Sequence, residues 1–293
     1  MSNPYKSAQK SYNQFNPRVP QMTKKILRKN NIKLFGQGTQ TMMFAHGFGC
    51  DQNMWRFVTP AFEKNYKIIL FDYVGCGKSD ISAYSSKRYS DLNGYVQDVL
   101  DICEELALTD VIFVGHSVSS MIGVVSSIQA PNYWERLILL GPSPCYINDL
   151  PKNYYGGFER KDIEDLLDIM EKNYIGWASF MAPMVMQNQD RPELIDELEA
   201  SFCSTDPVIA SRFAEVTFYS DNRSDLPKVS VPSLILQCAD DAIAPAEVGH
   251  YLHRHLPKST LGLMKATGHC PHMSHPQETI EMIKKYLSAP HTT

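Results

Sequence analysis

The segment Gly115-His116-Ser117-Val118-Ser119 places a serine where it could act as a nucleophile. Apolar runs at residues 111–114 and 121–125 flank it, which predicts a strand, a sharp turn and a helix with Ser117 at the apex. Such a turn exposes the serine oxygen and points backbone N–H groups of the next helix toward it. The common pattern is G-x-S-x-G, and Ser119 stands here for the last glycine. An ordinary buried serine in such a turn gives the same pattern. Ser117 can therefore be assigned as a nucleophile only if the other residues of an active site are found elsewhere in the chain.

A nucleophilic serine needs a base, and the base needs an acid that fixes its tautomer. His269 stands in Gly-His-Cys-Pro-His, directly after a predicted strand at residues 260–264. A loop leaving that edge of a parallel sheet can reach Ser117. Two neighbouring carboxylates, Asp240 and Asp241, follow the predicted strand at 233–238 and compete for the role of the acid.

A third motif could stabilise the oxyanion that such a serine generates. His46-Gly47-Phe48-Gly49 follows a predicted strand at residues 41–45, and a plain glycine-containing turn is the simpler interpretation of it. Active sites of this kind take one backbone N–H from this loop and one from the residue after the nucleophile. These positions are Phe48 and Val118. The motifs around Phe48, Ser117, Asp240 and His269 all follow predicted strands, in the order that such an active site requires. This favours an active site over coincidence.

The elements that must position these residues alternate between strand and helix. Further strands are predicted at residues 66–71, 111–114 and 137–140, and helices at 51–64 (broken or bent at Pro60), 90–106, 246–255 and 276–287. A short hairpin is predicted to open the fold at 25–28 and 32–35. This alternation indicates an α/β fold, a mostly parallel central sheet with helices on both faces.

Residues 145–227 interrupt that alternation. Helical segments are predicted there at 159–172, 174–186 (interrupted at Pro183), 192–202 and 207–219, without a convincing strand. We therefore expect an inserted helical cap between two parts of a core, 23–144 and 228–290. Residues 1–22 are polar and predict a disordered or surface-wrapping extension. Most cap aromatic residues should pack the cap on the core, and a minority should line a cavity beneath it.

Composition excludes several classes of protein. The net charge of −4 gives no basic excess for nucleic-acid binding, and the apolar runs are too short to span a membrane. Seven cysteines without a C-x-x-C pair predict a reducing, cytoplasmic environment.

No cofactor or metal is expected. Gly75-Cys76-Gly77 is too short for a dinucleotide-binding loop. His269, His272 and His275 lack an accompanying carboxylate or cysteine cluster, and Pro271 disfavours a regular ligand-bearing helix.

Six longer motifs carry a resemblance to the α/β-hydrolase superfamily. Within it, residues 24–287 resemble the group of the bacterial stress regulator RsbQ and the plant karrikin and strigolactone receptors. The motifs are AHGFGCDQNMW (45–55), FDYVGCGKSD (71–80), GHSVSSMIG (115–123), GPSPCYIND (141–149), YYGGFE (154–159) and GHCPHMSHP (268–276). The order Ser, Asp, His is typical of α/β-hydrolases, and GHSVS is typical of this group.

The resemblance implies a role for each matching residue. Ser117 would be the nucleophile, His269 the base and Asp241 the orienting acid, with the oxyanion held at Phe48 and Val118. The cap would be a V-shaped lid of four helices. The aromatic pocket positions implied are Tyr146, Phe158, Phe180, Phe202 and Phe218.

Several functions remain open at this point. The first is a cofactor-free serine hydrolase acting on a small, mostly apolar ester or lactone, for which the resemblance also implies a role as a stress-signalling regulator. The second is a non-metabolic ligand receptor that binds a protein partner, for which the resemblance implies a PAS-domain phosphatase. The third is a carbon–carbon bond hydrolase or perhydrolase with the same triad. Dehalogenases and epoxide hydrolases need an aspartate where this chain has Ser117.

Overall fold

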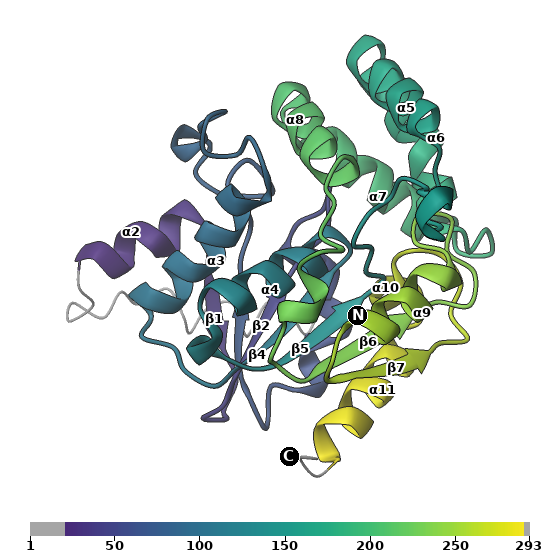
Figure 1. Cartoon of the computed structure of the whole chain (residues 1–293). Helices are drawn as coiled ribbons and strands as arrows, with labels where there is room; N and C mark the ends of the chain where they lie inside the picture. The colour runs from purple at the N-terminus through teal and green to yellow at the C-terminus, as the bar shows by residue number, and fades with distance from the viewer. Residues whose placement is uncertain (1–20, 290–293) are drawn as a thin grey trace.

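Seven strands form one central sheet in the computed structural model, which describes residues 21–289 (Figure 1). The strand order is β1-β3-β2-β4-β5-β6-β7, and every neighbouring pair is parallel except β1 with β3. The strands are β1 (Lys33–Phe35), β2 (Thr41–Ala45), β3 (Lys67–Leu70), β4 (Val111–His116), β5 (Trp134–Leu140), β6 (Ser233–Gln237) and β7 (Ser259–Leu263). Because β2 and β4 are adjacent, the loops that follow them meet at one edge of the sheet.

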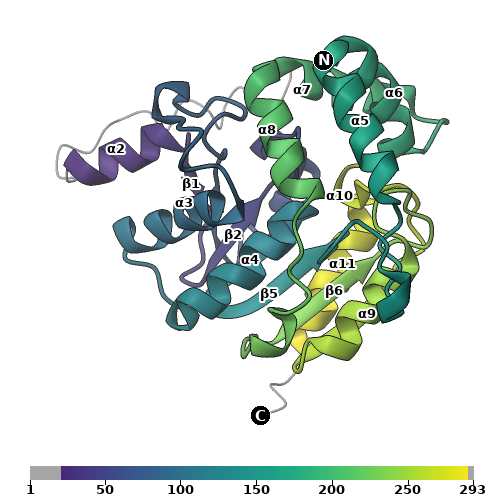
Figure 2. The ribbon, with the colours of Figure 1, turned by 45° about the horizontal axis from the view of Figure 1, so that its top comes forward.

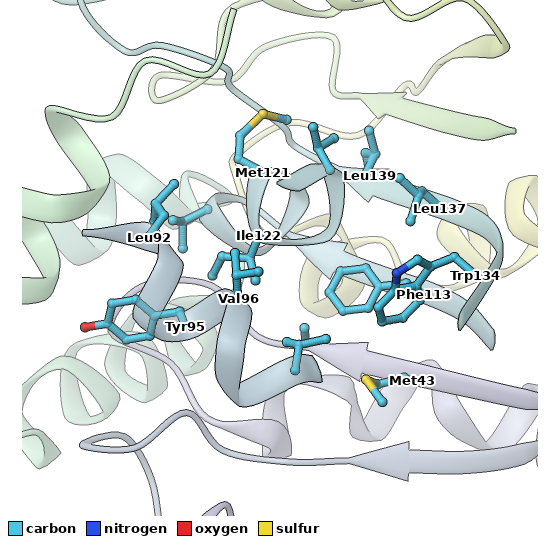
Figure 3. Packing of buried hydrophobic residues seen from close by; sticks show 14 of the residues in the cluster. Met43, Leu92, Tyr95, Val96, Phe113, Met121, Ile122, Trp134, Leu137 and Leu139 are labelled. Carbon is cyan, nitrogen blue, oxygen red and sulfur yellow. The ribbon is translucent and has the colours of Figure 1, made fainter. Parts of the chain in front are cut away.

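Each face of the sheet is covered by its own apolar cluster. Met43 and Ala45 of β2 point to the face covered by α3 (Leu92–Glu105), α4 (Val118–Gln129) and α9 (Ala246–His255), where Phe113 and Trp134 also pack (Figure 3). Met42 and Phe44 point to the opposite face, against α11 (Pro276–Ser288). The period of two is that of a buried strand between two helical layers. The predicted α/β fold, a mostly parallel sheet with helices on both faces, is confirmed.

Two predicted elements are wrong or differ in form. Residues 25–28 belong to helix α2 (Gln21–Lys29), not to a hairpin; Ile26 is its contact with the core, and Asn31 ends the helical region with a φ of 45°. Asparagine tolerates this left-handed conformation, which commonly terminates helices. The predicted helix at 51–64 is two short 3₁₀ helices, Gln52–Phe57 and Thr59–Ala61, with Pro60 in the second.

Four helices lie over the carboxyl ends of the strands (Figures 1 and 2). They are α5 (Arg160–Lys172), α6 (Tyr174–Met186), α7 (Pro192–Ser204) and α8 (Pro207–Phe218), and α6 continues through Pro183 as one helix. We call this group the cap. The chain segments that enter and leave the cap pair with each other at an isolated antiparallel β-bridge between Cys145 and Asp221.

The predicted division of the chain at residues 145 and 227 stays a prediction, and residues 1–20 of the predicted extension lie outside the described part. Across residues 21–289, no helix combines the length and the hydropathy needed to cross a membrane.

Candidate active site

Ser117 occupies a strained turn between β4 and α4. Its φ of 57° and ψ of −125° lie in a region that side-chain-bearing residues rarely adopt. Gly115 allows the turn to close, because a Cβ there would lie 2.6 Å from the carbonyl oxygen of Ser119. The Ser117 side chain therefore projects from the sheet edge beside the N-terminus of α4, as the sequence predicts.

Three side chains from separate loops form a hydrogen-bonded chain. The Ser117 Oγ lies 2.8 Å from His269 Nε2, and His269 Nδ1 lies 2.8 Å from Asp241 Oδ2. Because a carboxylate accepts hydrogen bonds, His269 carries its proton on Nδ1 and presents the Nε2 lone pair to the serine hydroxyl. In this arrangement His269 can take the serine proton.

Asp241, and not Asp240, occupies the position beside His269. The Asp241 carboxylate is buried, and its Oδ1 also accepts backbone N–H groups of Ile243 (2.9 Å) and Ala244 (3.0 Å). Asp240 is exposed and contributes only its main-chain oxygen, which accepts the N–H of Gly268 at 2.8 Å. The backbone donors orient Asp241 and stabilise its charge.

The loop after β2 passes directly beside Ser117. A Cβ on Gly47 would lie 3.3 Å from Ser117 Cβ and 2.6 Å from His116 Nδ1, so only glycine allows this approach. Phe48 follows Gly47, while Val118 is the first residue of α4. N–H groups in the first turn of a helix have no partner within the helix, so the Val118 N–H is available to an anion.

Ser119 joins this loop to the Ser117 turn. Its hydroxyl donates to the main-chain oxygen of His46, and the Tyr73 hydroxyl lies 2.9 Å from Ser119 Oγ. The Tyr73 N–H in turn donates to His46 Nε2 at 3.2 Å. The sequence suggested only that Ser119 is small; the structure adds that its hydroxyl holds two loops together, which glycine could not do.

His269 is held through its main chain. Its N–H donates to the Val185 oxygen at the end of α6, and its own oxygen accepts from His116 Nε2, both at 2.8 Å. The His116 ring packs in turn against the His272 ring at a tilt of 54°, with ring centroids 4.4 Å apart. Burial lowers the pKa of His272 to about 3 and that of His116 well below its ordinary value, so both rings are neutral at neutral pH. Within residues 21–289, no group of three or more potential ligands could hold a metal ion.

A small apolar cavity of about 30 Å³ lies between Ser117 and the cap. It is lined by Phe48, Cys50, His116, Ser117, Tyr146, Trp177, Met181, Val185, Leu198, Phe202, Thr217, Phe218, Ile243, His269 and Cys270. This lining contains no Asp, Glu, Lys or Arg side chain. The volume holds about two or three water molecules, so a larger ligand requires the surrounding side chains or the cap to move.

Three of the five predicted pocket residues line this cavity, namely Tyr146, Phe202 and Phe218. Phe180 does not: it is 61% exposed on the outer side of α6, so its predicted place in the pocket is wrong. Phe158 does not line it either; its ring packs behind Phe218, with centroids 6.3 Å apart. Both corrections concern residues whose side-chain direction the sequence leaves open.

Comparison with known proteins identifies the family. A model described as the alpha/beta hydrolase family matches residues 42–282. The chain belongs to this family. It is 39% identical to the Karrikin insensitive 2 receptor CA of Petunia hybrida over 259 residues, which cover 88% of this chain and 95% of that protein. It is 36% identical to the Strigolactone esterase D14 of Arabidopsis thaliana, covering 89% and 97%.

A solved structure of a hydrolase from Oleispira antarctica superimposes on this alpha/beta hydrolase with a TM-score of 0.89. The two chains are 46% identical, and the match covers 92% of this chain and 98% of the other. These findings confirm the predicted resemblance to the karrikin and strigolactone receptor group.

Sequence reasoning missed several cavity residues of this alpha/beta hydrolase. Trp177, Met181 and Val185 lie four residues apart on α6 and form one inward stripe. The signal was present in that spacing, but α6 is apolar on its outer side as well, where Ile175 and Phe180 are exposed. A helix without a polar face gives no indication of which side is buried.

Proposed function

We propose that this protein is a serine hydrolase of a small, mostly apolar ester or lactone. Ser117 Oγ attacks the carbonyl carbon while its proton passes to His269 Nε2, and Asp241 keeps His269 in the required tautomer. The oxyanion is stabilised by the N–H groups of Phe48 and Val118. The proton on His269 then goes to the leaving alkoxide, and water repeats the sequence on the acyl-enzyme to release the acid.

The observation that carries this proposal is the continuous chain of hydrogen bonds from Asp241 through His269 to Ser117. The apolar cavity supports a small uncharged substrate, since a charged one would lose its hydration there without an opposite charge to pair with. The seven free cysteines are consistent with a reducing compartment, and we propose a cytoplasmic location.

The test is to remove the nucleophile. We expect Ser117→Ala to lower kcat for p-nitrophenyl butyrate by at least about 10³-fold, with the folded structure retained. A fluorophosphonate should add its mass to the wild type and not to the variant. Ser127→Ala is the matched control, because Ser127 is also buried on α4 and its hydroxyl bonds only to the Val124 oxygen. Unchanged turnover in Ser117→Ala would refute the serine mechanism.

A second candidate is a regulator in which ligand binding or cleavage changes the position of the cap. Two observations favour it: relatives of this chain are named receptors, and the cavity is too small for a ligand unless the cap or its lining moves. A ligand can shift such a cap only by binding its two positions with different affinity. The partner we propose is a PAS-domain phosphatase.

The test of the regulator uses the outer surface of α5. Glu164→Lys changes an exposed cap residue away from the cavity, so it should spare ester hydrolysis and abolish crosslinking to the phosphatase. Turnover of a common metabolite at hundreds per second, with no crosslinked partner, would favour a metabolic enzyme instead.

A further inference from the structure

Two main-chain oxygens that precede Phe48 in the loop after β2 each accept a hydrogen bond from a side chain. The Ser119 hydroxyl donates to the His46 oxygen, and His46 Nδ1 lies 2.9 Å from the Gly47 oxygen. Both side chains are fully buried, so bulk water does not compete for these bonds. Side chains, and not the loop alone, therefore determine the direction of the backbone here.

Tyr73, in the loop after β3, contributes to both of these bonds. Its hydroxyl lies 2.9 Å from Ser119 Oγ, and because Ser119 donates its one hydroxyl proton to the His46 oxygen, Tyr73 is the donor in this contact. Burial raises the pKa of Tyr73, so the phenol keeps this proton. The Tyr73 N–H donates to His46 Nε2 at 3.2 Å. The His46 proton is therefore on Nδ1, from which it is donated to the Gly47 oxygen.

The Gly47 oxygen and the Phe48 N–H belong to one planar peptide unit. The bond between these residues is trans, so the oxygen and the N–H point in opposite directions. Holding the Gly47 oxygen therefore fixes the direction of the Phe48 N–H, which is one of the two proposed oxyanion donors. The Cys50 N–H also donates to the Gly47 oxygen, at 3.3 Å, but Cys50 belongs to the same loop and does not fix that loop on the core.

We propose that Tyr73 and Ser119 are positioning residues for the oxyanion site, because together they set the direction of the Phe48 N–H. Neither side chain lines the cavity, so they act through the loop and not on the substrate. An oxyanion donor is effective only when it is oriented in advance toward the oxygen that becomes charged. Glycine at position 119, the common residue in such a turn, would lack the bond to the loop. This inference rests on the proposed function and adds two residues to it.

Variants that lack one hydroxyl test this with p-nitrophenyl butyrate. Outright loss of an oxyanion donor costs about 10²–10³-fold in kcat, so a misdirected donor should cost less: about 30-fold in Ser119→Ala and in Ser119→Gly, which restores the common pattern. Tyr73→Phe keeps the ring and the main-chain N–H, and should lower kcat by about tenfold. KM should stay within about twofold in all three, because the lost interaction stabilises only the transition state. A kcat within about twofold of the wild type in either Ser119→Ala or Tyr73→Phe would overturn the proposal.

Each substitution has a matched control nearby. Ser126→Ala also removes a buried hydroxyl from α4, but that hydroxyl bonds only to the Gly123 oxygen of the same helix. Tyr95→Phe removes a buried hydroxyl that has no partner among the described residues, from a ring whose centroid lies 5.6 Å from that of Tyr73. Both controls should keep kcat within about twofold of the wild type. If the variants at Ser119 do not fold, Tyr73→Phe, which removes a single oxygen atom, decides alone.

An analogue of the oxyanion separates positioning from damage to the fold. When a small alkyl trifluoromethyl ketone binds, Ser117 Oγ adds to its carbonyl carbon, the serine proton passes to His269 Nε2, and the carbonyl oxygen becomes an oxyanion. Its inhibition constant should rise in Ser119→Ala and Tyr73→Phe by the factor by which kcat/KM falls. An unchanged inhibition constant would mean that these variants only lose active protein, and would overturn the proposal.

The wild type separates this inference from the proposed function. If it neither cleaves the ester nor binds the ketone, the proposed function fails and this inference fails with it. If it does both, and the two variants match it, this inference alone fails.

Discussion

Ser117 and His269 lie on two loops that are held in place differently. The Ser117 turn is fixed by neighbouring core elements: its N–H donates to the Leu140 oxygen of β5, and its oxygen accepts from the Ser120 N–H of α4. The His269 loop is held by both the cap and the core: its N–H bonds to Val185 and the Asn188 side chain bonds to the oxygen of Thr267, while the His269 oxygen accepts from His116 of β4. The serine position therefore depends on the core, whereas the histidine position depends on the core and on the cap.

That difference links the cap to the chemistry. The segment that ends α6 contacts the His269 loop, and the next short helix, α10 (Pro271–Ser274), lies between the cap and α11 (Figure 2). A movement of the cap that admits a ligand would act on His269 before it acts on Ser117. The regulator and the hydrolase in our proposal would then share one structural connection.

The largest effect that bears on this comparison comes from the acid that orients His269. Asp241→Asn should lower kcat by about 10³–10⁴-fold, because an amide favours the imidazole tautomer that cannot accept the serine proton. Asp240→Asn is the matched control and should stay within about twofold, since that side chain is exposed. The assay is p-nitrophenyl ester hydrolysis with both proteins at equal folded concentration. A larger loss of activity in Asp240→Asn than in Asp241→Asn would show that Asp240, and not Asp241, orients His269.

The same contrast explains how much of the site the sequence could predict. The Ser117 turn was predictable because glycines, a serine and two apolar runs specify it locally. Asp241 and Asp240 could not be separated by pattern alone: the difference is that Ile243 and Ala244 turn their N–H groups toward Asp241. Tertiary contacts of that kind leave no local signal.

The cap shows where such reasoning fails. Phe180 and Trp177 are both aromatic residues of an apolar helix, yet one is exposed and the other is buried against the cavity. Packing of α6 on α5 and α7 decides between them.

A smaller effect should follow from disturbing the contact between the cap and the His269 loop. Gly268 has a φ of 82°, and a Cβ there would lie 2.2 Å from the Met186 oxygen. Gly268→Ala should therefore displace His269 and lower kcat by about 10²-fold, with little change in KM. Gly262→Ala in β7 is the control, because its Cβ would meet the ends of two side chains, Met282 at 2.7 Å and Leu236 at 3.0 Å, and no backbone atom closer than 3.5 Å. Equal activity of the two variants would show that the cap does not hold the histidine.

The smallest expected effect is on the stability of the folded protein in acid, and it comes from His272, which closely follows His269 in the sequence. His272 is fully buried and its two ring nitrogens have no partner among the described residues, so its folded pKa of about 3 lies below the ordinary value of about 6.5. The unfolded chain therefore takes up a proton here between about pH 6.5 and 3 that the folded chain does not. Stability from this residue is complete above about pH 6.5 and falls by about 1.4 kcal/mol per pH unit as the pH drops through that window.

Replacing the ring nitrogens isolates that contribution. His272→Phe keeps an aromatic ring against Trp55 and His116, so urea unfolding should show a free energy that falls less steeply between pH 6 and 4 than in the wild type. His250→Gln, at an exposed position of α9, provides a control for histidine loss. The pKa of His116 is also lowered by burial, so His116 keeps part of the slope in the variant. An unchanged slope in His272→Phe would mean that the His269 loop opens to water in acid before the core unfolds, so that His272 is protonated in a chain whose Ser117 turn is still intact.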